Sequence, residues 1–344
     1  MRIGFDAKRY FHNHTGLGNY SRTLVTDLKR QFPDVDAVLY DEKSFTRTFR
    51  LGRKAAADGC QIFHGLSNEL LYDLRRGAAG LPLSVVTIHD TAWRTFPAMY
   101  HPIDRRIYDV KYGHAARHAD CVVAISESTR RDVMRFYDVP AERVRVIYQP
   151  VQRMFYQPLE GPLPDEAPYL LSVGSINERK NLWGTIKAYA RLSAENRPRL
   201  LVVGQGGDYA RRCRRLVSEL GLERDVTFLG SVNTTERLHA LYCGAVAMLY
   251  PSYYEGFGLP VVEALLSGCP VLTSTVSSLP EAAGPGALYC APDSVDEMAA
   301  QMQRLVDDEA LRERLAREGG DYCRAKFAPE LLTRQMYELY TSLL

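Results

Sequence analysis

Three features that would point to particular protein classes are missing from this sequence. No stretch approaches the roughly 20 consecutive apolar residues of a membrane-spanning helix. The first residues, Met-Arg-Ile-Gly-Phe-Asp, become charged too early for a secretory signal. No basic stripe with interleaved stacking aromatics appears, which argues against nucleic acid as a partner. We therefore expect a cytoplasmic protein without a membrane span.

Metal-binding motifs are also missing. The seven cysteines are odd in number, scattered and without a C-x-x-C pair, which argues against a disulfide framework and a zinc site. Asp34-Val35-Asp36 has the D-x-D form of some metal-holding sequences, but it lies beside a proline in a predicted turn. The cluster His12, Asn13 and His14 lacks a matching set of cysteines or carboxylates. We expect no metal and no other cofactor.

The net charge is small, but it is unevenly distributed along the chain. The protein carries a formal charge of +2, yet residues 1–150 hold 23 Lys and Arg against 17 Asp and Glu. The first half is therefore basic and the remainder acidic. A basic half suits peripheral contact with an anionic membrane or a phosphorylated acceptor, whereas scattered cations are often only solvated. Composition leaves both interpretations open.

The sequence does contain a regular alternation of strand-like and helix-like patterns. Its 344 residues, 46% of them hydrophobic, are enough for two globular domains. Short β-branched runs alternating with amphipathic helices are typical of parallel sheets covered on both faces, so the predicted fold class is α/β. The first half predicts strands at Arg2–Phe5, Ala37–Tyr40, Gln61–Phe63, Val85–Ile88, Cys121–Ile125 and Val144–Ile147. It predicts helices at Tyr20–Gln31, Ile103–His118 and Ser128–Phe136, the last capped by Ser126.

A proline-rich segment, Gln157–Pro168, separates the two halves, because its prolines would interrupt a helix or a central strand. The second half predicts strands at Tyr169–Val173, Arg199–Val203, Val226–Leu229, Val246–Tyr250, Val271–Thr273 and Ala287–Tyr289. It predicts helices at Leu182–Leu192, Tyr209–Leu220, Thr235–Tyr242 and from Val295 onward. We expect two Rossmann-like doubly wound domains facing across a cleft, at 1–156 and 169–328. A linker at 157–168 joins them, and a helix at 329–344 packs back toward the first domain.

A glycine-containing loop between a predicted strand and a predicted helix is the clearest candidate site. The loop Pro251–Gly258 precedes a helix from Leu259 whose first turn holds a proline, which suits a helix start. Gly256 and Gly258 allow the backbone to approach a ligand, and the helix N-terminus adds a partial positive charge. The loop therefore predicts an anion site that needs no metal.

Two carboxylates flank this anion site. Glu263 lies one turn inside the helix, where phosphate would repel it but ribose hydroxyls could donate hydrogen bonds to it. Glu255, just before the glycines, could reach the hydroxyls of a sugar. Taken alone, the segment would favour an ordinary helix start whose acidic residues complement the helix dipole.

Further motifs in the chain change this interpretation. Within Tyr-Pro-Ser-Tyr-Tyr-Glu-Gly-Phe-Gly-Leu-Pro, the spacing of Glu255 and Glu263 resembles the nucleotide-binding motif of retaining glycosyltransferase family 4, which has the GT-B fold. Other family signatures are matched in order by Thr15–Tyr20, Ile88–Asp90, Ala124–Ser128, Val173–Ser175 with Arg179–Asn181, and Val226–Gly230. The resemblance extends over nearly the whole chain.

The resemblance implies donor-binding roles in the second domain. The residues that it places on the nucleotide sugar are Gly174, Ser175, Arg179, Lys180, Glu255, Gly256, Phe257, Gly258, Leu259 and Glu263. Arg179 and Lys180 could neutralise the charge that builds on a departing diphosphate, in place of a metal ion. The alternative is a solvated pair before a helix. Many family members carry an arginine where this sequence has Ser175, and Arg179 is the candidate to replace it.

In the first domain, the resemblance implies a catalytic role for His89, at the carboxyl end of an apolar strand. The alternative is a structural histidine. Gly16 and Gly18 are expected in a flexible loop after the first strand that either closes over the donor phosphates or positions the acceptor. The acceptor-side candidates are His64, Asn19 and Tyr20.

The implied function is transfer of a hexosyl group, with mannosyl as one candidate, from a nucleotide-diphosphate sugar to a glycan or lipid-linked acceptor. The implied chemistry retains the anomeric configuration and needs no metal, with His89, Glu255, Arg179 and Lys180 as catalytic residues. Polysaccharide or lipopolysaccharide assembly at the inner face of the membrane is the implied setting. A nucleotide-sugar epimerase of the same architecture and a non-catalytic sugar- or nucleotide-binding module remain as alternatives.

Overall fold

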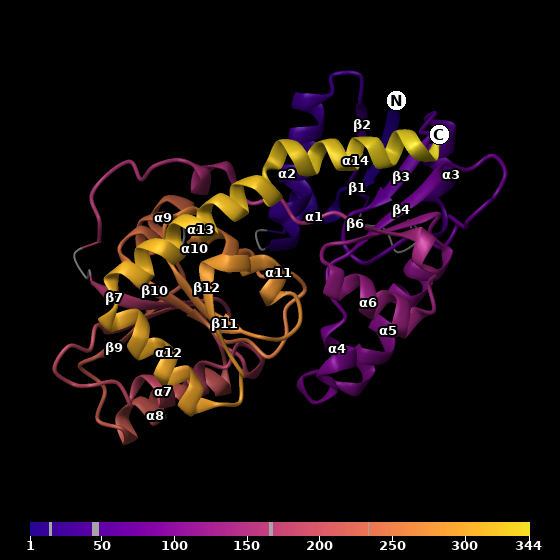
Figure 1. Cartoon of the computed structure of the whole chain (residues 1–344). Coiled ribbons are helices and arrows are strands. Elements are labelled where there is room, and N and C mark those ends of the chain that lie inside the picture. Colours follow the sequence, from indigo (N-terminus) through magenta and orange to yellow (C-terminus); the bar gives the residue numbers. More distant parts are fainter. Residues whose placement is uncertain (14–15, 43–47, 165–167, 233) are drawn as a thin grey trace. The chain divides into compact units, whose positions relative to one another are not determined.

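The computed structural model describes residues 1–13, 16–42, 48–164, 168–232 and 234–344 (Figure 1). Contacts divide the chain into two units, of which unit 1 comprises Met1–Pro150 and Phe327–Leu344, and unit 2 comprises Val151–Lys326. Residues 151–156, expected in the first domain, belong to unit 2. The reason is that Phe155, on the short helix η4 (Arg153–Tyr156), packs edge-on against the rings of His239 and Tyr242.

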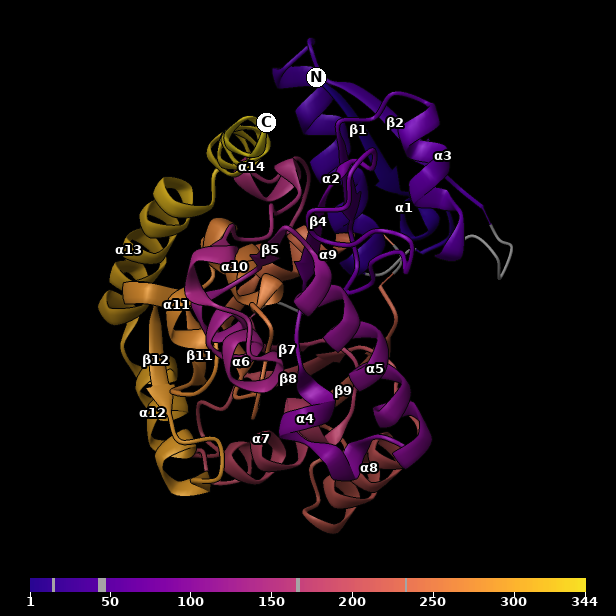
Figure 2. The same ribbon diagram turned by 90° about the vertical axis from the view of Figure 1, so that its right-hand side faces the viewer.

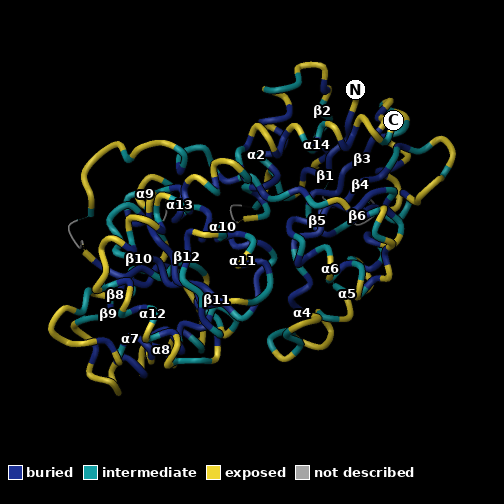
Figure 3. The backbone as a smooth tube through the Cα atoms, in the orientation of Figure 1, coloured by how far each residue is buried: buried dark blue, intermediate teal, exposed yellow. Residues whose placement is uncertain are grey.

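Unit 1 is built on a six-stranded parallel sheet with strand order β2-β1-β3-β4-β5-β6. Its strands are β1 (Arg2–Asp6), β2 (Asp36–Tyr40), β3 (Ile62–Gly65), β4 (Leu83–Ile88), β5 (Cys121–Ala124) and β6 (Val144–Val146). The central strands are buried along their length (Figure 3), as expected for parallel strands covered on both faces. The order reverses between β1 and β3, which makes the carboxyl ends of these two strands the natural ligand position.

Helices cover both faces of this sheet. They are α1 (Lys8–His12), α2 (Gly16–Gln31), α3 (Leu51–Ala57), α4 (Ala92–Thr95), α5 (Pro102–His118), α6 (Glu127–Tyr137) and α14 (Pro329–Leu343), with short helices η2 (Pro97–Met99) and η3 (Ala141–Arg143). The predicted cap of α6 is confirmed, because the Ser126 hydroxyl accepts a hydrogen bond from the Thr129 amide. The last helix, α14, packs against α2, where the rings of Tyr337 and Phe32 stack.

The prediction of a flexible glycine loop after the first strand is wrong. Gly16 and Gly18 form the first turn of α2, which therefore begins earlier than the predicted Tyr20. Gly18 is required by packing, since a Cβ there would fall 1.8 Å from the carbonyl oxygen of Asn13. This position consequently needs a small residue for close backbone contact, not for mobility.

Unit 2 repeats the design with strand order β12-β11-β10-β7-β8-β9. Its strands are β7 (Tyr169–Val173), β8 (Arg199–Val203), β9 (Val226–Gly230), β10 (Ala245–Tyr250), β11 (Val271–Ser274) and β12 (Ala287–Cys290). Its helices are α7 (Leu182–Tyr189), α8 (Asp208–Glu219), α9 (Thr235–Cys243), α10 (Leu259–Leu266), α11 (Leu279–Ala283), α12 (Val295–Asp307) and α13 (Glu309–Phe327), with η5 (Glu178–Lys180) and η6 (Gly284–Gly286). All strand pairs are parallel, which confirms the predicted doubly wound α/β class.

Both sheets keep their apolar residues in the interior. Figure 2 shows the sheets and their helices from a second direction. In unit 2, the apolar side chains of β7, β8 and β10 pack with those of α7, α8 and α12. Among the described residues, no helix combines the length and the apolar character that crossing a membrane requires.

Candidate functional site

The candidate site lies where the sheet of unit 2 reverses its strand order. Strands β7 and β10 are neighbours there, although two other strands separate them along the chain. The segment after β7 carries Gly174 and Ser175 and continues into η5, while the segment after β10 is the loop Pro251–Gly258. Because parallel strands end at the same edge, the topology brings together two segments that the sequence keeps about 75 residues apart.

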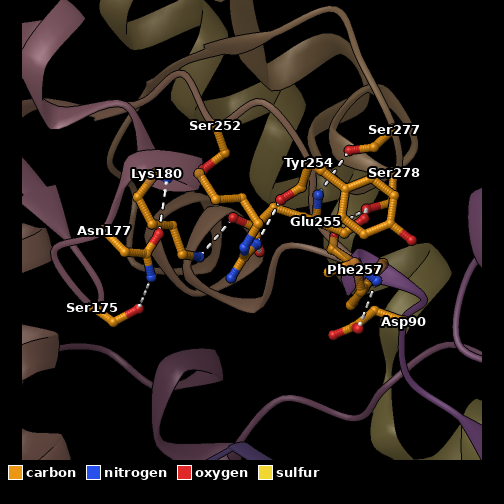
Figure 4. A network of polar contacts seen from close by, with 12 residues as sticks. Asp90, Ser175, Asn177, Lys180, Ser252, Tyr254, Glu255, Phe257, Ser277 and Ser278 are labelled. Atoms are coloured by element: carbon orange, nitrogen blue, oxygen red, sulfur yellow. Dashed lines mark hydrogen bonds and ion pairs between the residues drawn. The ribbon is translucent and has the colours of Figure 1, made fainter. Parts of the chain in front are cut away.

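The centre of this site is a carboxylate held by two cations. Arg179 Nη1 lies 2.7 Å from Glu255 Oε2. Lys180 Nζ lies 2.6 Å from Glu255 Oε1, and Figure 4 shows Lys180 and Glu255 side by side. Glu255 is only 7% exposed. Burial by itself would raise the pKa of the Glu255 carboxyl, but Lys180 and Arg179 outweigh it and hold that pKa below its usual value. We call this arrangement the Glu255 clamp.

Neighbouring groups fix the two cations of the Glu255 clamp. Arg179 Nη1 also donates to the carbonyl of Tyr254 at 2.5 Å, and Lys180 Nζ donates to the hydroxyl of Tyr250. The ammonium lies 4.5 Å from the centre of the Tyr250 ring, within cation–π range. The η5 turn itself is capped by Asn177, whose side-chain oxygen accepts a hydrogen bond from the Lys180 amide at 3.3 Å.

Serine and threonine hydroxyls in β11 and just after it hold the site loop in place. Ser278 Oγ lies 2.8 Å from the carbonyl oxygens of both Glu255 and Phe257, and Ser277 Oγ accepts from the Glu255 amide at 2.9 Å. Thr273 Oγ1 donates to the Tyr250 carbonyl at 2.9 Å. A binding loop braced in this way is preorganised by the scaffold.

The loop ends at the start of α10. Gly258 has φ +111°, a left-handed conformation that strongly favours glycine. The helix begins at Leu259 with Pro260 in its first turn, and none of the described side chains caps it. The partial positive charge of a helix N-terminus suits an anionic or hydroxyl-bearing ligand. Phe257 is buried in the scaffold, so it supports the loop.

Glu263 lies apart from the Glu255 clamp. Its Oε2 accepts a hydrogen bond from the Tyr242 hydroxyl at 3.1 Å, which connects α10 to α9. Burial raises the pKa of the Glu263 carboxyl to about 7, although the Tyr242 hydrogen bond opposes this shift. The carboxyl therefore changes charge close to neutral pH.

The glycine after β7 shows why the neighbouring loop must also contain glycine. Gly174 has φ +133°, and its carbonyl oxygen would lie 1.8 Å from a Cβ placed on Gly204. The loops after β7 and β8 are therefore in close backbone contact. Ser175 is exposed and its hydroxyl accepts from Asn177 Nδ2 at 3.0 Å, so this position carries a hydroxyl and no cation.

His89 is buried in unit 1 and only 4% exposed. Its Nε2 is 2.9 Å from the Leu66 carbonyl and its Nδ1 is 2.7 Å from the Gln149 amide nitrogen, so an imidazole protonated on Nε2 satisfies both partners. Burial lowers its pKa to about 4. The ring is therefore neutral at physiological pH, and any catalytic part it plays would be as a neutral group.

The structure contradicts the expected direct acceptor contacts of His64 and Tyr20. The His64 ring nitrogens pair with the Tyr340 hydroxyl at 2.6 Å and with Thr87 Oγ1 at 2.9 Å, and the Tyr20 hydroxyl pairs with the same Thr87 at 2.9 Å. Both side chains are buried. Their hydrogen bonds form a polar bridge that connects the sheet with α2 and α14. Asn19 accepts a hydrogen bond from Arg22 through its side-chain oxygen at 2.7 Å.

The residues that resemble metal ligands in the sequence pair with other side chains. His12 contacts Asp41 at 2.8 Å, Asp34 accepts from the Tyr337 hydroxyl, and Asp36 pairs with Arg2. His14 and Thr15 lie outside the described residues. Among the residues that the structure describes, no group of three His, Cys, Asp or Glu side chains is placed to hold a metal ion.

Comparison with known proteins identifies the family of this chain. The family model described as Glycosyl transferases group 1 matches residues 158–321, and the one described as Glycosyltransferase Family 4 matches residues 12–153. The O-antigen chain mannosyltransferase B of Escherichia coli is 32% identical over 297 residues, which cover 81% of this chain and 74% of that protein.

Solved structures of the same fold cover the whole chain. Sucrose-phosphate synthase from Thermosynechococcus elongatus aligns with a TM-score of 0.82 at 22% identity, covering 100% of this chain and 99% of that one. HepE from Anabaena, in complex with UDP and glucose, aligns with a TM-score of 0.74 at 18% identity, covering 99% and 100%. At these identities the likeness shows the fold, which is GT-B.

The family models and the Escherichia coli relative show the class of protein: the chain belongs to the superfamily of glycosyltransferases that the two models describe. It is a glycosyltransferase, as its motifs predicted.

Some residues of the site were not predicted from the sequence. Tyr250, Tyr242 and Ser278 contact the Glu255 clamp, Glu263 and the site loop respectively. Tyr250 closes an apolar strand, a position where functional groups of parallel sheets gather, and that signal could have identified it. Tyr242 and Ser278 carry no comparable signal, because their contacts depend on how α9 and α11 pack.

Proposed function

We propose that this glycosyltransferase is a retaining member of family 4 that transfers a hexosyl group from a nucleotide-diphosphate sugar to a glycan or lipid-linked acceptor without a metal. Mannosyl is the first candidate for the sugar, because the Escherichia coli relative is named as a mannosyltransferase. The Glu255 clamp carries the proposal. It holds two cations against Glu255 in the loop that leads into α10, and a diphosphate bound there needs positive charge.

The donor diphosphate is proposed to take over Arg179 and Lys180 from Glu255. Phosphate oxygens and the Glu255 carboxylate compete for the same cations, and the diphosphate carries the larger charge. As the glycosidic bond breaks, negative charge accumulates on the departing phosphate, and two fixed cations stabilise that charge without reorganising. They would thereby supply the electrostatic role that a divalent ion has elsewhere, and Arg179 would replace the arginine expected at Ser175.

The remaining proposed contacts are those to the sugar and the ribose of the donor. Glu255, freed from its cations, would accept hydrogen bonds from hydroxyls of the transferred sugar, together with the loop backbone at Gly256–Gly258. Glu263 would accept hydrogen bonds from the ribose, which requires its carboxyl to lose the proton that burial favours. His89 is proposed to contact the reacting sugar as a neutral group from unit 1.

One experiment separates the proposed transfer from its two alternatives. Purified protein is incubated with GDP and UDP sugars, with and without a glycan acceptor extract, and both free nucleotide and sugar products are followed. Transfer predicts nucleotide release together with an extended glycan only when acceptor is present. Isomerised sugar from donor alone would identify an epimerase, and tight nucleotide binding without turnover on any acceptor would identify a binding module.

A helix of unit 1 supports peripheral contact with an anionic membrane. On α5, Ile103, Ile107 and Val110 are 63%, 44% and 56% exposed, and their spacing places them on one face. The exposed Arg106 and Lys111 lie on the same helix. Apolar residues beside cations suit the boundary between acyl chains and anionic head groups. We infer that this α5 face holds the enzyme near a lipid-linked acceptor.

A further inference from the structure

Unit 2 carries a pocket next to the Glu255 clamp. A cavity of about 400 Å³ is lined by Glu178, Asn181, Trp183, Tyr209, Arg212 and Tyr253. Its volume lies within the range of about 300–1,000 Å³ that is usual for small-molecule sites. Over the described residues, this lining includes none of the three residues of the Glu255 clamp. The pocket is therefore a separate feature, which we call the aromatic pocket.

Hydrogen bonds hold the walls of the aromatic pocket in place. The Trp183 amide donates to the Tyr209 hydroxyl at 3.0 Å, which joins α7 to α8. Asn181 caps α7 and donates from its amide to the carbonyls of Pro251 and Pro292. The Tyr253 amide donates to the Arg179 carbonyl at 2.8 Å. The walls belong to three segments that are fixed to one another, so the pocket is preformed.

Three aromatic side chains give the pocket its character. Trp183, Tyr209 and Tyr253 are each half-buried, so part of each side chain is open to solvent. Single exposed aromatics are ordinary, but three around one cavity form a concentrated apolar wall. Burial raises the pKa of both tyrosines, so their hydroxyls stay neutral and can take part in hydrogen bonds.

An exposed ion pair adds polar groups to these walls. Arg212 Nη2 lies 2.7 Å from Glu178 Oε1, and the Arg212 guanidinium lies 5.3 Å from the centre of the Tyr209 ring. The carboxylate is an acceptor and the guanidinium a multiple donor. A ligand suited to the pocket has an apolar face that packs on aromatic rings and an edge with both donors and acceptors.

A pyranose ring has these properties, because its C–H groups form an apolar face and its hydroxyls both donate and accept. We propose that the aromatic pocket binds a pyranose unit of a glycan. The inference rests on the proposed function in one respect: the occupant is taken to be part of the acceptor glycan. Its role would be to retain a growing chain on the enzyme between transfers.

Tryptophan fluorescence can test this inference, because the chain has two tryptophans, Trp93 and Trp183. Trp93 is buried in unit 1, where its indole donates to Asp109, whereas Trp183 lines the pocket. α-Mannotriose is titrated into the wild-type chain and into Trp93→Phe, which leaves Trp183 as the reporter. We expect a saturable change in emission in both proteins.

Variants assign the signal to the pocket. Tyr253→Ala and Arg212→Ala should weaken mannotriose binding about tenfold or more, a loss of about 1.4 kcal/mol. Arg215→Ala, which removes an exposed arginine from the same helix, should leave binding unchanged. Nucleoside diphosphate binding, measured by thermal shift, should be the same in Arg212→Ala and Arg215→Ala, which shows that both remain folded.

Three results would overturn the inference. They are no saturable change in wild type, equal affinity in all variants, and a Trp183 response to guanosine or uridine in place of mannotriose. Because the titration needs no turnover, it can succeed even where the chain transfers no sugar. Normal transfer with no Trp183 response would refute the aromatic pocket alone and leave the proposed function standing.

Discussion

Glu255 pairs with two cations at once, and this makes its charge important for both folding and function. The carboxylate is buried and the side chains of Arg179 and Lys180 are 19% and 14% exposed, so removal of the charge would leave two poorly solvated cations together. Breaking such a pair costs about 3 kcal/mol or more. The depressed pKa of Glu255 implies stability that is present at neutral pH and lost as the pH falls through that pKa.

We predict that Glu255→Gln lowers the free energy of unfolding by about 3 kcal/mol at pH 7. A nucleoside diphosphate should restore much of this loss, because its phosphates replace the missing carboxylate beside Arg179 and Lys180. Sugar transfer should nevertheless fall, since the contact to the sugar hydroxyls is weakened. Chemical denaturation with and without nucleotide measures the effect, and a variant as stable as wild type would contradict the importance of the clamp.

The elevated pKa of Glu263 predicts a pH dependence of donor binding. The carboxyl titrates at about 7, and only its ionised form offers the full set of acceptors to ribose hydroxyls. The affinity for a nucleotide sugar should therefore increase as the pH rises through 7, and Glu263→Gln should remove this dependence. Calorimetric titration between pH 6 and pH 8 tests this, and an identical pH dependence in the variant would refute it.

Folding stability responds to Glu263 with the opposite sign. Because the folded-state pKa is higher than the unfolded value near 4.5, the protonated folded state is favoured at low pH. This contribution to the free energy of unfolding is lost as the pH rises toward and through 7. At neutral pH, ionised Glu263 can therefore bind the ribose, but its ionisation lowers the free energy of unfolding.

At the scale of secondary-structure elements, the start of α2 provides a direct test of the corrected glycine loop. A Cβ on Gly18 would collide with the Asn13 carbonyl, whereas no described residue apart from its chain neighbours lies within 4 Å of the corresponding position on Gly16. Gly18→Ala should lower the free energy of unfolding by about 2 kcal/mol or more, and Gly16→Ala should change it by less than about 1 kcal/mol. Equal tolerance of both variants would favour the mobile loop.

The sequence predicted the regular elements well and the short ones poorly. Tyr169–Val173 and Arg199–Val203 are strands with the predicted bounds, because an unbroken apolar run is unambiguous between turn signals. The helices α1, α3, α4 and α11 were not predicted. They are only a few residues long, so periodicity cannot reveal them, and tertiary contacts decide their formation.

The site was predicted in its parts but not in its connections. Motifs pointed to Arg179, Lys180 and Glu255, yet they were given separate ligands, phosphate for the cations and sugar for the carboxylate. That both cations pair with Glu255 follows from the adjacency of β7 and β10, which no local pattern records. The buried bridge of His64 and Tyr20 to Tyr340 depends in the same way on α14, the last helix of the chain.

At the scale of the whole molecule, the α5 face predicts association with lipid. We expect the protein to float with liposomes that contain anionic lipid at low salt and to be released as salt is added, because charge attraction is screened. Replacing Ile103 and Ile107 together by aspartate should abolish flotation and preserve turnover on a water-soluble acceptor. Protein that remains entirely in solution at low salt would exclude this contact.

The central claim is that Lys180 and Arg179 replace a metal ion at the donor diphosphate. The most direct measurement is kcat/KM for sugar transfer in excess EDTA, compared between wild type, Lys180→Ala and Lys187→Ala, an exposed lysine of the same unit. We predict full activity of wild type and Lys187→Ala in EDTA, and a loss of about 10²–10³-fold in Lys180→Ala without unfolding. Near-normal activity of Lys180→Ala, or turnover that EDTA abolishes and magnesium restores, would contradict the account.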